Sequence, residues 1–130
     1  MCIRDRIKYY KDILKIAAEE KYEVVLIDCI TILLFRLICK YRLEELEIIK
    51  NELEKKIENE VSSFFKEFLE VTRSAHFKFI IVSNEVGMGL VPANPLGRIF
   101  RDLMGMVNKQ IANISDEAYF FLAGLKQKLK

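Results

Sequence analysis

The carboxylate of Asp28 is the first side chain whose position suggests chemistry. It follows residues 24–27, a continuous branched apolar run that predicts a fully buried parallel strand. A carboxylate at the end of a buried strand needs a partner. In nucleotide-binding α/β proteins this partner is often the hydrated Mg²⁺ of the nucleotide. The alternative is that Asp28 caps the next helix, whose first turn includes Thr31.

A second polar cluster ends the next apolar run, residues 79–82. Three polar residues and two glycines follow that run: Ser83, Asn84, Glu85, Gly87 and Gly89. In open α/β sheets, ligands bind outside the carboxyl ends of the strands, at junctions of this kind. Glycines there allow positive φ angles and close approach of the backbone to a ligand. We therefore expect Asp28 and this cluster to face one crevice.

The helix predicted over residues 94–113 supports this interpretation. Asn94 is a good N-cap, and Pro95 suits the first helical position. At about 100° per residue, one face is apolar and must be buried. That face consists of Leu96, Ile99, Phe100, Leu103, Val107 and Ile111.

The opposite face of the same helix carries two guanidinium groups beside a residue that has no side chain. Its members are Arg98, Arg101, Gly105 and Asn108. Such a notch can hold an anion, for example a phosphate, through forked hydrogen bonds. The alternative is an ordinary solvated face with an Arg98–Asp102 ion pair.

Composition indicates one domain of ordinary size, because the 130 residues are 52% hydrophobic with a net charge of +2. The sequence has no concentrated basic stripe of the kind that indicates nucleic-acid binding. Three cysteines without paired spacing argue against a disulfide framework or zinc site and favour a reducing compartment. Charges interrupt every apolar run before the ~18 residues of a membrane span. We therefore expect a cytoplasmic protein.

The remaining pattern predicts the order α-β-α-α-β-α-β in a layered α/β sheet. We expect a helix from Ile7 to Ala17, an almost completely buried helix over 30–41, and a long amphipathic helix over 43–68 lying on the sheet. In the helix over 43–68, the mean spacing of the apolar residues is too long for a left-handed coiled coil. A dimerisation helix remains an alternative. His76 is expected in a surface connector, residues 118–122 form a last strand, and the terminal lysines form a frayed tail.

Several of these stretches resemble one known family. They are VVLIDCIT (24–31), VSNEVGMGLVPANPLGRIFRDLMGMVN (82–108), DEAY (116–119) and AGLKQKLK (123–130). Together they resemble the bifunctional adenosylcobinamide kinase/adenosylcobinamide-phosphate guanylyltransferase family of cobalamin biosynthesis. The likeness covers roughly residues 24–130, and its second stretch is the most specific.

The resemblance implies a P-loop NTPase-like (RecA-like) fold, a three-layer sandwich with a mostly parallel sheet. It also implies phosphorylation of adenosylcobinamide by ATP or GTP, then GMP transfer from GTP through a guanylylated histidine, in an oligomer that is typically a trimer. Carried over to this chain, Asp28 occupies the position of the acid that is expected to hold Mg²⁺ through water. The expected nucleotide-binding residues are Asp28, Ser83, Asn84, Glu85, Arg98, Arg101 and Asn108.

The family's glycine-rich phosphate-binding loop and its nucleophilic histidine do not occur in this sequence. We therefore expect the chain to be the C-terminal part of a longer protein and inactive by itself, with residues 1–6 artefactual. An apolar sheet face should then lie open to water and bind hydrophobic dye. The alternative function is a non-catalytic corrinoid- or nucleotide-binding or oligomerisation module.

Overall fold

The computed structural model of the chain describes residues 10–130. The predicted artefactual segment 1–6, Cys2 and the expected helix start at Ile7 lie outside the described residues. The elements, in order, are α1 Tyr10–Glu19, β1 Val24–Asp28, α2 Ile30–Cys39, the 3₁₀ turn η1 Leu43–Glu45, α3 Asn51–Ser74, β2 Lys78–Val82, α4 Pro95–Ile114, β3 Tyr119–Leu122 and β4 Leu125–Lys128.

Strands β1 and β2 pair in parallel, so that Leu26 lies opposite Ile80 and Asp28 opposite Val82. The prediction that these strands are fully buried is wrong, because exposed and partly buried residues alternate along both of them. Ile27 and Ile81 pack against the helical core. Leu26 and Ile80 point the other way and are 62% and 54% exposed. Among the described residues, only one face of this sheet is covered.

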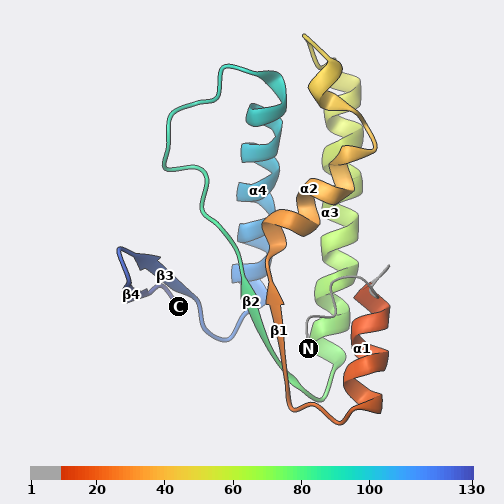
Figure 1. Cartoon of the computed structure of the whole chain (residues 1–130), viewed down its shortest axis with the longest axis vertical. Helices are drawn as coiled ribbons and strands as arrows, with labels where there is room; N and C mark the ends of the chain where they lie inside the picture. Colours follow the sequence, from red (N-terminus) through yellow and green to blue (C-terminus); the bar gives the residue numbers. More distant parts are fainter. Residues whose placement is uncertain (1–9) are drawn as a thin grey trace.

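The covered face meets α2, α3 and α4, which are packed together beside the sheet (Figure 1). The core is apolar and its central side chains are fully buried, which is the main source of folding free energy. Helix α4 contributes Ile99, Leu103 and Val107, as its predicted apolar stripe requires, and α3 contributes Phe65 and Phe68. The structure thus confirms the orientation of α4, the helix that follows the glycine loop.

Helix α2 is buried on one face and not on nearly all sides as expected. Its residues Ile30, Leu34 and Ile38 are buried at helical spacing, whereas Ile32 and Phe35 are 42% and 48% exposed. A helix of this composition was expected to be covered all round. Within residues 10–130, no element covers its second face.

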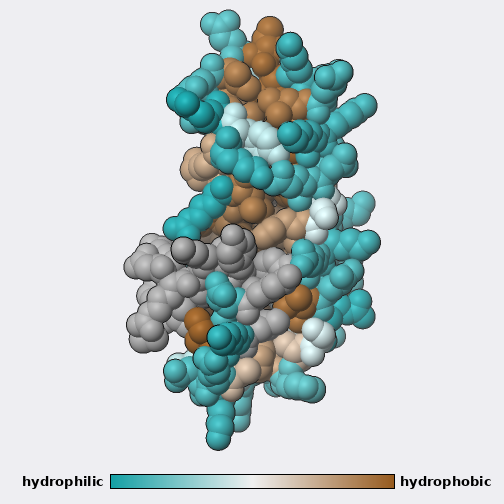
Figure 2. Space-filling view, turned by 90° about the vertical axis from the view of Figure 1, so that its right-hand side faces the viewer, coloured by the Kyte–Doolittle hydropathy of each residue, from teal (hydrophilic) through white to brown (hydrophobic). Residues whose placement is uncertain are grey.

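The long helix begins at Asn51, so the prediction that it begins at residue 43 is wrong. Arg42 adopts a left-handed conformation, η1 follows, and Leu46 is extended. The neighbouring β-branched pair Ile48 and Ile49 favours a helix less than an unbranched pair would. Hydrophobic side chains reach the surface at the upper end of the molecule in Figure 2, the end that holds this connection in Figure 1. Leu46 and Ile48 are exposed there.

The C-terminal lysines do not form a frayed tail, because β4 pairs with β3 as an antiparallel hairpin. Ala123 and Gly124 both have positive φ, as a tight two-residue hairpin turn requires. Lys130 donates from Nζ to the carbonyl oxygens of Ala112 and Asn113 in the last turn of α4. This hairpin forms a separate sheet, so β3 is not the last strand of the β1–β2 sheet.

Residues 10–130 therefore form an α/β structure with a small parallel sheet and helices. Because the helices cover one face of that sheet, the third layer of the expected sandwich stays a prediction. None of the helices in this range has both the length and the apolar character that crossing a membrane requires.

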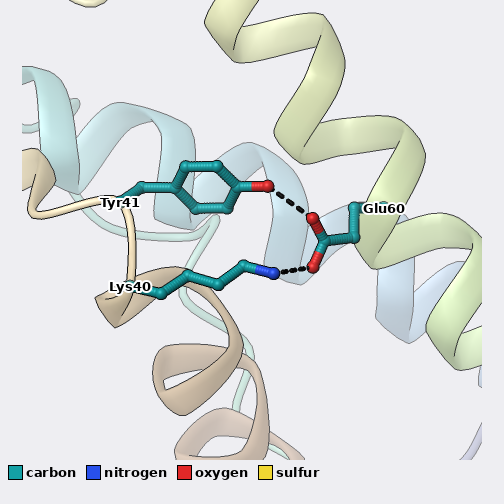
Figure 3. A network of polar contacts seen from close by, with 3 residues as sticks. All are labelled: Lys40, Tyr41 and Glu60. Atoms are coloured by element: carbon teal, nitrogen blue, oxygen red, sulfur yellow. Dashed lines mark hydrogen bonds and ion pairs between the residues drawn. The ribbon is translucent and has the colours of Figure 1, made fainter.

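A polar contact fixes the reversal between α2 and α3. The carboxylate of Glu60 on α3 accepts hydrogen bonds from Lys40 Nζ and Tyr41 Oη, just beyond the end of α2 (Figure 3). The hydrogen bonds from Lys40 and Tyr41 hold the pKa of Glu60 below its ordinary value of 4.5. The hydrogen bond to Glu60, together with burial and the nearby negative charge, raises the pKa of Tyr41 to about 12.

The pKa shifts of Glu60 and Tyr41 predict that this contact stabilises the fold over a broad pH range and less at either extreme. Glu60, whose pKa is lowered by folding, adds stability above pH 4.5 that is lost as the pH falls through the lowered pKa. Tyr41 adds stability below its ordinary pKa of 10.0 that is lost as the pH rises through about 12. Because the Glu60 side chain is 41% exposed, solvent screening limits the contribution to about 0.2–1 kcal/mol.

Glu60→Gln is therefore expected to lower the free energy of unfolding between these limits and to flatten both flanks of its pH dependence. Denaturant titrations at a series of pH values measure this, with Glu58→Gln on the exposed face of the same helix as the control. A Glu60→Gln profile that matches the wild type would show that the contact adds no stability.

Substitutions on the uncovered and the covered face of the sheet should have different effects. Leu26→Thr with Ile80→Thr should reduce binding of a hydrophobic dye and change the free energy of unfolding by less than about 0.5 kcal/mol per site. Ile81→Thr, one residue along β2 and facing the core, should lower that free energy by about 1–3 kcal/mol. Dye fluorescence and denaturant titration measure the two effects. Unchanged dye binding by the Leu26/Ile80 variant would contradict the claim that this sheet face is open to solvent.

Candidate functional site

The candidate site lies where β1 and β2 end. Because the strands are parallel and Asp28 is paired with Val82, the residues that follow both strands emerge at the same edge of the sheet. Ser83 and Asn84 directly follow β2, and α2 begins two residues after Asp28. The structure thus confirms that the two strand ends lie side by side. The shared crevice expected for Asp28 and residues 83–85 stays a prediction.

A side-chain hydrogen bond joins the two strand ends. Asn84 Nδ2 donates to Thr31 Oγ1 over 2.7 Å. Thr31 lies in the first turn of α2, and sequence reasoning considered it only as part of a helix that Asp28 could cap. The signal that could have identified it is its place three residues after the strand-end acid, where a helix N-terminus faces the crevice.

The side chain of Asp28 is exposed and makes no hydrogen bond or ion pair with any residue in the range 10–130. It does not cap α2, because Cys29 occupies the N-cap position and no side chain caps the helix there. Its carboxylate is therefore free to meet a ligand. The described residues contain no group of three or more acidic, histidine or cysteine side chains around one point. A single carboxylate suits Mg²⁺ that keeps most of its water and is shared with phosphates, as this ion prefers.

Helix α4 holds the end of β2 through Asn108. Ser83 Oγ donates to Asn108 Oδ1 over 2.6 Å, and Asn108 Nδ2 donates to the carbonyl oxygen of Asn84 over 3.0 Å. Both ends of the Asn108 amide are thus engaged with the strand end. The structure brings Ser83, Asn84 and Asn108 together and gives Asn108 a positioning contact. The nucleotide binding expected of these residues stays a prediction.

The two arginines of α4 are turned toward the connection between β2 and α4. Arg101 Nη2 donates to the carbonyl oxygen of Gly87. Arg98 Nη1 donates to the carbonyl oxygens of Ala93, over 2.6 Å, and Pro92, over 3.3 Å. Among residues 10–130, Arg98 forms no ion pair with Asp102, so this part of the alternative is wrong. Arg98 and Gly105 are exposed, so the face stays open to solvent beside these hydrogen bonds.

Arg101 also carries an unsatisfied group. Its Nη1 atom is buried and has no hydrogen-bond partner within residues 10–130. A buried donor without an acceptor costs free energy, commonly about 1–3 kcal/mol. An anion that reached this guanidinium would supply the missing acceptor, and a charged acceptor binds more strongly than a neutral carbonyl. The geometry is compatible with the predicted anion notch.

The ends of the connection are fixed to the strand end and to α4. Glu85 Oε1 accepts from the backbone N–H of Gly87 over 2.6 Å, and Asn94 caps α4 by accepting from the N–H of Gly97 over 2.6 Å. The capping prediction for Asn94 is confirmed. A Cβ atom built on Gly97 would lie 2.6 Å from Cβ of Pro92. Gly97 therefore lets the proline rest on the first turn of the helix.

The only histidine lies at the other end of the sheet. His76 is exposed in the connector before β2, as expected, and lines a cavity of about 490 Å³ with Lys21 and Lys78 near the strand starts. A smaller cavity of about 150 Å³ lies between the α2–α3 connection and the start of α4, where Arg98 contributes to its wall. His76 therefore does not belong to the strand-end site.

The strand-end site can hold an anion and a hydrated cation. It offers one free carboxylate from Asp28, a polar tip at Asn84, and guanidinium groups on the adjoining helix. In open α/β proteins, ligands bind in the crevice outside the carboxyl ends of parallel strands, which is where these groups lie.

The family model described as cobinamide kinase/cobinamide phosphate guanyltransferase matches residues 5–129. The bifunctional adenosylcobalamin biosynthesis protein CobU of Escherichia coli is 34% identical over 110 residues, which are 83% of this chain and 59% of that protein. The protein of the same name from Salmonella typhimurium is 47% identical over 53 residues, 41% of this chain and 29% of its own length. The chain thus matches less than two thirds of the length of these relatives.

This chain belongs to the cobinamide kinase/cobinamide phosphate guanyltransferase family, because the family model matches almost all of it. The resemblance found in the sequence is confirmed at the level of the family. The individual roles expected of Asp28, Ser83, Asn84, Glu85, Arg98, Arg101 and Asn108 stay predictions.

Alanine substitutions at two glycines of α4 test whether Pro92 packs against the first turn of this helix. Gly105→Ala adds a Cβ that meets nothing within 4 Å, so it should raise the free energy of unfolding by about 0.5–1 kcal/mol through helix propensity. Gly97→Ala should lower it by about 1–3 kcal/mol, because Pro92 must move away. Denaturant titration of both variants measures the difference. Equal stabilisation by the two alanines would mean that Pro92 does not rest on the helix.

Proposed function

We propose that this chain is the C-terminal part of a bifunctional enzyme of cobalamin biosynthesis. The enzyme phosphorylates adenosylcobinamide with ATP or GTP and then transfers GMP from GTP to adenosylcobinamide phosphate, giving adenosylcobinamide-GDP. In the first step the substrate hydroxyl loses its proton and takes the γ-phosphoryl group from the nucleotide. In the second, a guanylylated histidine passes GMP to the phosphate after pyrophosphate has left. The family match over residues 5–129 carries this proposal.

The strand-end residues support the phosphoryl-transfer half of the proposal. Such transfer depends mainly on positioning and on stabilising the charge of the phosphate oxygens. Asp28 would hold the water shell of Mg²⁺, and Asn84 and Glu85 would face the nucleotide from the neighbouring strand end. Arg98 and Arg101 would neutralise phosphate charge, which also gives the buried Arg101 Nη1 an acceptor. Ser83 and Asn108 would keep this edge in place.

The remaining machinery is proposed to lie in a part of the protein that precedes this chain. It comprises a glycine-rich phosphate-binding loop and the nucleophilic histidine, so the chain alone is expected to be inactive. The loop's strand and helix would complete a P-loop NTPase-like three-layer sandwich by covering the apolar sheet face that contains Leu26 and Ile80. We further propose that the complete enzyme is a cytoplasmic homotrimer.

A chimera tests the enzyme claim. This chain replaces the matching segment of the E. coli relative, and the conversion of cobinamide is measured with Mg²⁺ and either ATP or GTP. The unaltered chimera should be active. In the same chimera, Asp28→Asn should lower turnover about a hundredfold or more, because a charge that stabilises the transition state is removed. Circular dichroism and unfolding should be unchanged, since the side chain of Asp28 is exposed and has no partner within residues 10–130.

Glu58→Gln, on the exposed face of α3, is the control that also removes one carboxylate, and it should retain full turnover. A folded chimera that is inactive despite an intact relative-derived portion would remove the enzyme claim. Near-normal turnover of Asp28→Asn would remove the role proposed for this carboxylate.

The alternative, a non-catalytic corrinoid- or nucleotide-binding module, is favoured by one observation. Within residues 10–130, the histidine His76 lies beside the strand starts and away from the strand-end site. Such a module would bind cobinamide without Mg²⁺-nucleotide, and the folded chimera would bind it without turnover.

A further inference from the structure

The connection between β2 and α4 carries large apolar side chains into water. Met88, Leu90 and Val91 are 73%, 97% and 69% exposed, and we call residues 88–91 the apolar tip. Exposed loop residues are usually small or polar. Single exposed apolar residues need no explanation, but three within four consecutive positions form a patch. In Figure 1 this connection swings outward between the end of β2 and the start of α4.

The apolar tip is exposed although the chain on both sides of it is fixed. On one side, the N–H of Gly87 bonds to Glu85 and its carbonyl oxygen accepts from Arg101. On the other, the carbonyl oxygen of Ala93 accepts from Arg98. These contacts hold the segment between them away from the core. The exposure of the tip is thus imposed by the polar residues around it.

The tip also lies within reach of the strand-end site, because Met88 follows Asn84 by four residues, which span at most about 14 Å. It begins three residues after Glu85, and the arginines that fix its ends are the ones proposed to meet phosphate. A substrate whose reacting hydroxyl or phosphate lies at Asn84 would extend its remaining bulk past residues 88–91. In cobinamide that bulk is a rigid corrin ring, whose rim carries methyl groups and amide side chains.

We propose that the apolar tip is the surface on which the corrin ring of cobinamide packs, and that Met88 and Leu90 determine specificity for it. This inference rests on the proposed function. A second copy of the chain is a poorer occupant, because a stable protein interface buries about 800 Å² per partner, contributed by roughly 20–30 residues. Four residues suit the apolar wall of a small-molecule site. Arg98 and Arg101 then act as positioning residues for the tip.

The test measures binding of cobinamide to the 130-residue chain by equilibrium dialysis, using the visible absorbance of the corrin ring. Leu90→Ser and Met88→Ser should each weaken binding about tenfold, because each removes an apolar contact that the ligand would cover. Leu125→Ser is the matched control. It removes an apolar side chain that is 77% exposed on the hairpin and should leave the affinity unchanged.

The outcomes separate this inference from the proposed function. Equal binding by wild type and both tip variants would overturn the role of the tip and leave the enzyme claim intact. The same holds if the wild-type chain does not bind cobinamide while the chimera turns it over. If the chimera is inactive but the tip variants weaken binding, the tip stands and the enzyme claim falls. A tip variant that dissociates an oligomer without changing cobinamide affinity would assign the tip to a second copy and overturn the inference.

Discussion

The parallel pairing of β1 with β2 is the constraint on which the site depends. With Asp28 opposite Val82, the chain must leave both strands at the same edge, and an acid from one segment comes beside a polar tip from another. Side-chain exposure has a period of two in a strand, so a slip of one residue would turn Ile27 and Ile81 away from the core. The burial of these two residues against the helices therefore fixes the register, and the register fixes the site.

Helix α4 translates this register into the arrangement of the loop. Its buried stripe, with Leu103 and Val107 at the centre, sets its rotation about its own axis. The opposite face then presents Asn108 to the end of β2 and the two arginines to the connection. Substitutions in the core of α4 should consequently affect the loop as well as stability, because one rigid helix serves both.

Local signals in the sequence predicted much of this arrangement. The cap at Asn94, the apolar stripe of α4 and the polar residues after each strand depend on nearest neighbours and helical periodicity, and the structure confirms them. The prediction that β1 is buried on both faces was wrong, because a continuous apolar run does not reveal how many layers cover the strand. The terminal hairpin was missed because lysine side chains resemble a tail, although the tight turn at Gly124 was a usable signal. The hydrogen bonds of Arg98 and Arg101 to loop carbonyls could not be predicted, since they depend on how the connection folds back over α4.

The central claim is that the two strand ends form a single phosphate-binding edge. A crystal structure of the E. coli chimera with Mg²⁺ and a non-hydrolysable GTP analogue tests it most directly. The account predicts phosphate oxygens over the ends of β1 and β2, with the carboxylate of Asp28 facing the hydrated metal ion and the amide of Asn84 facing the phosphates. Phosphates bound elsewhere, with Asp28 and Asn84 both turned away from the nucleotide, would contradict it.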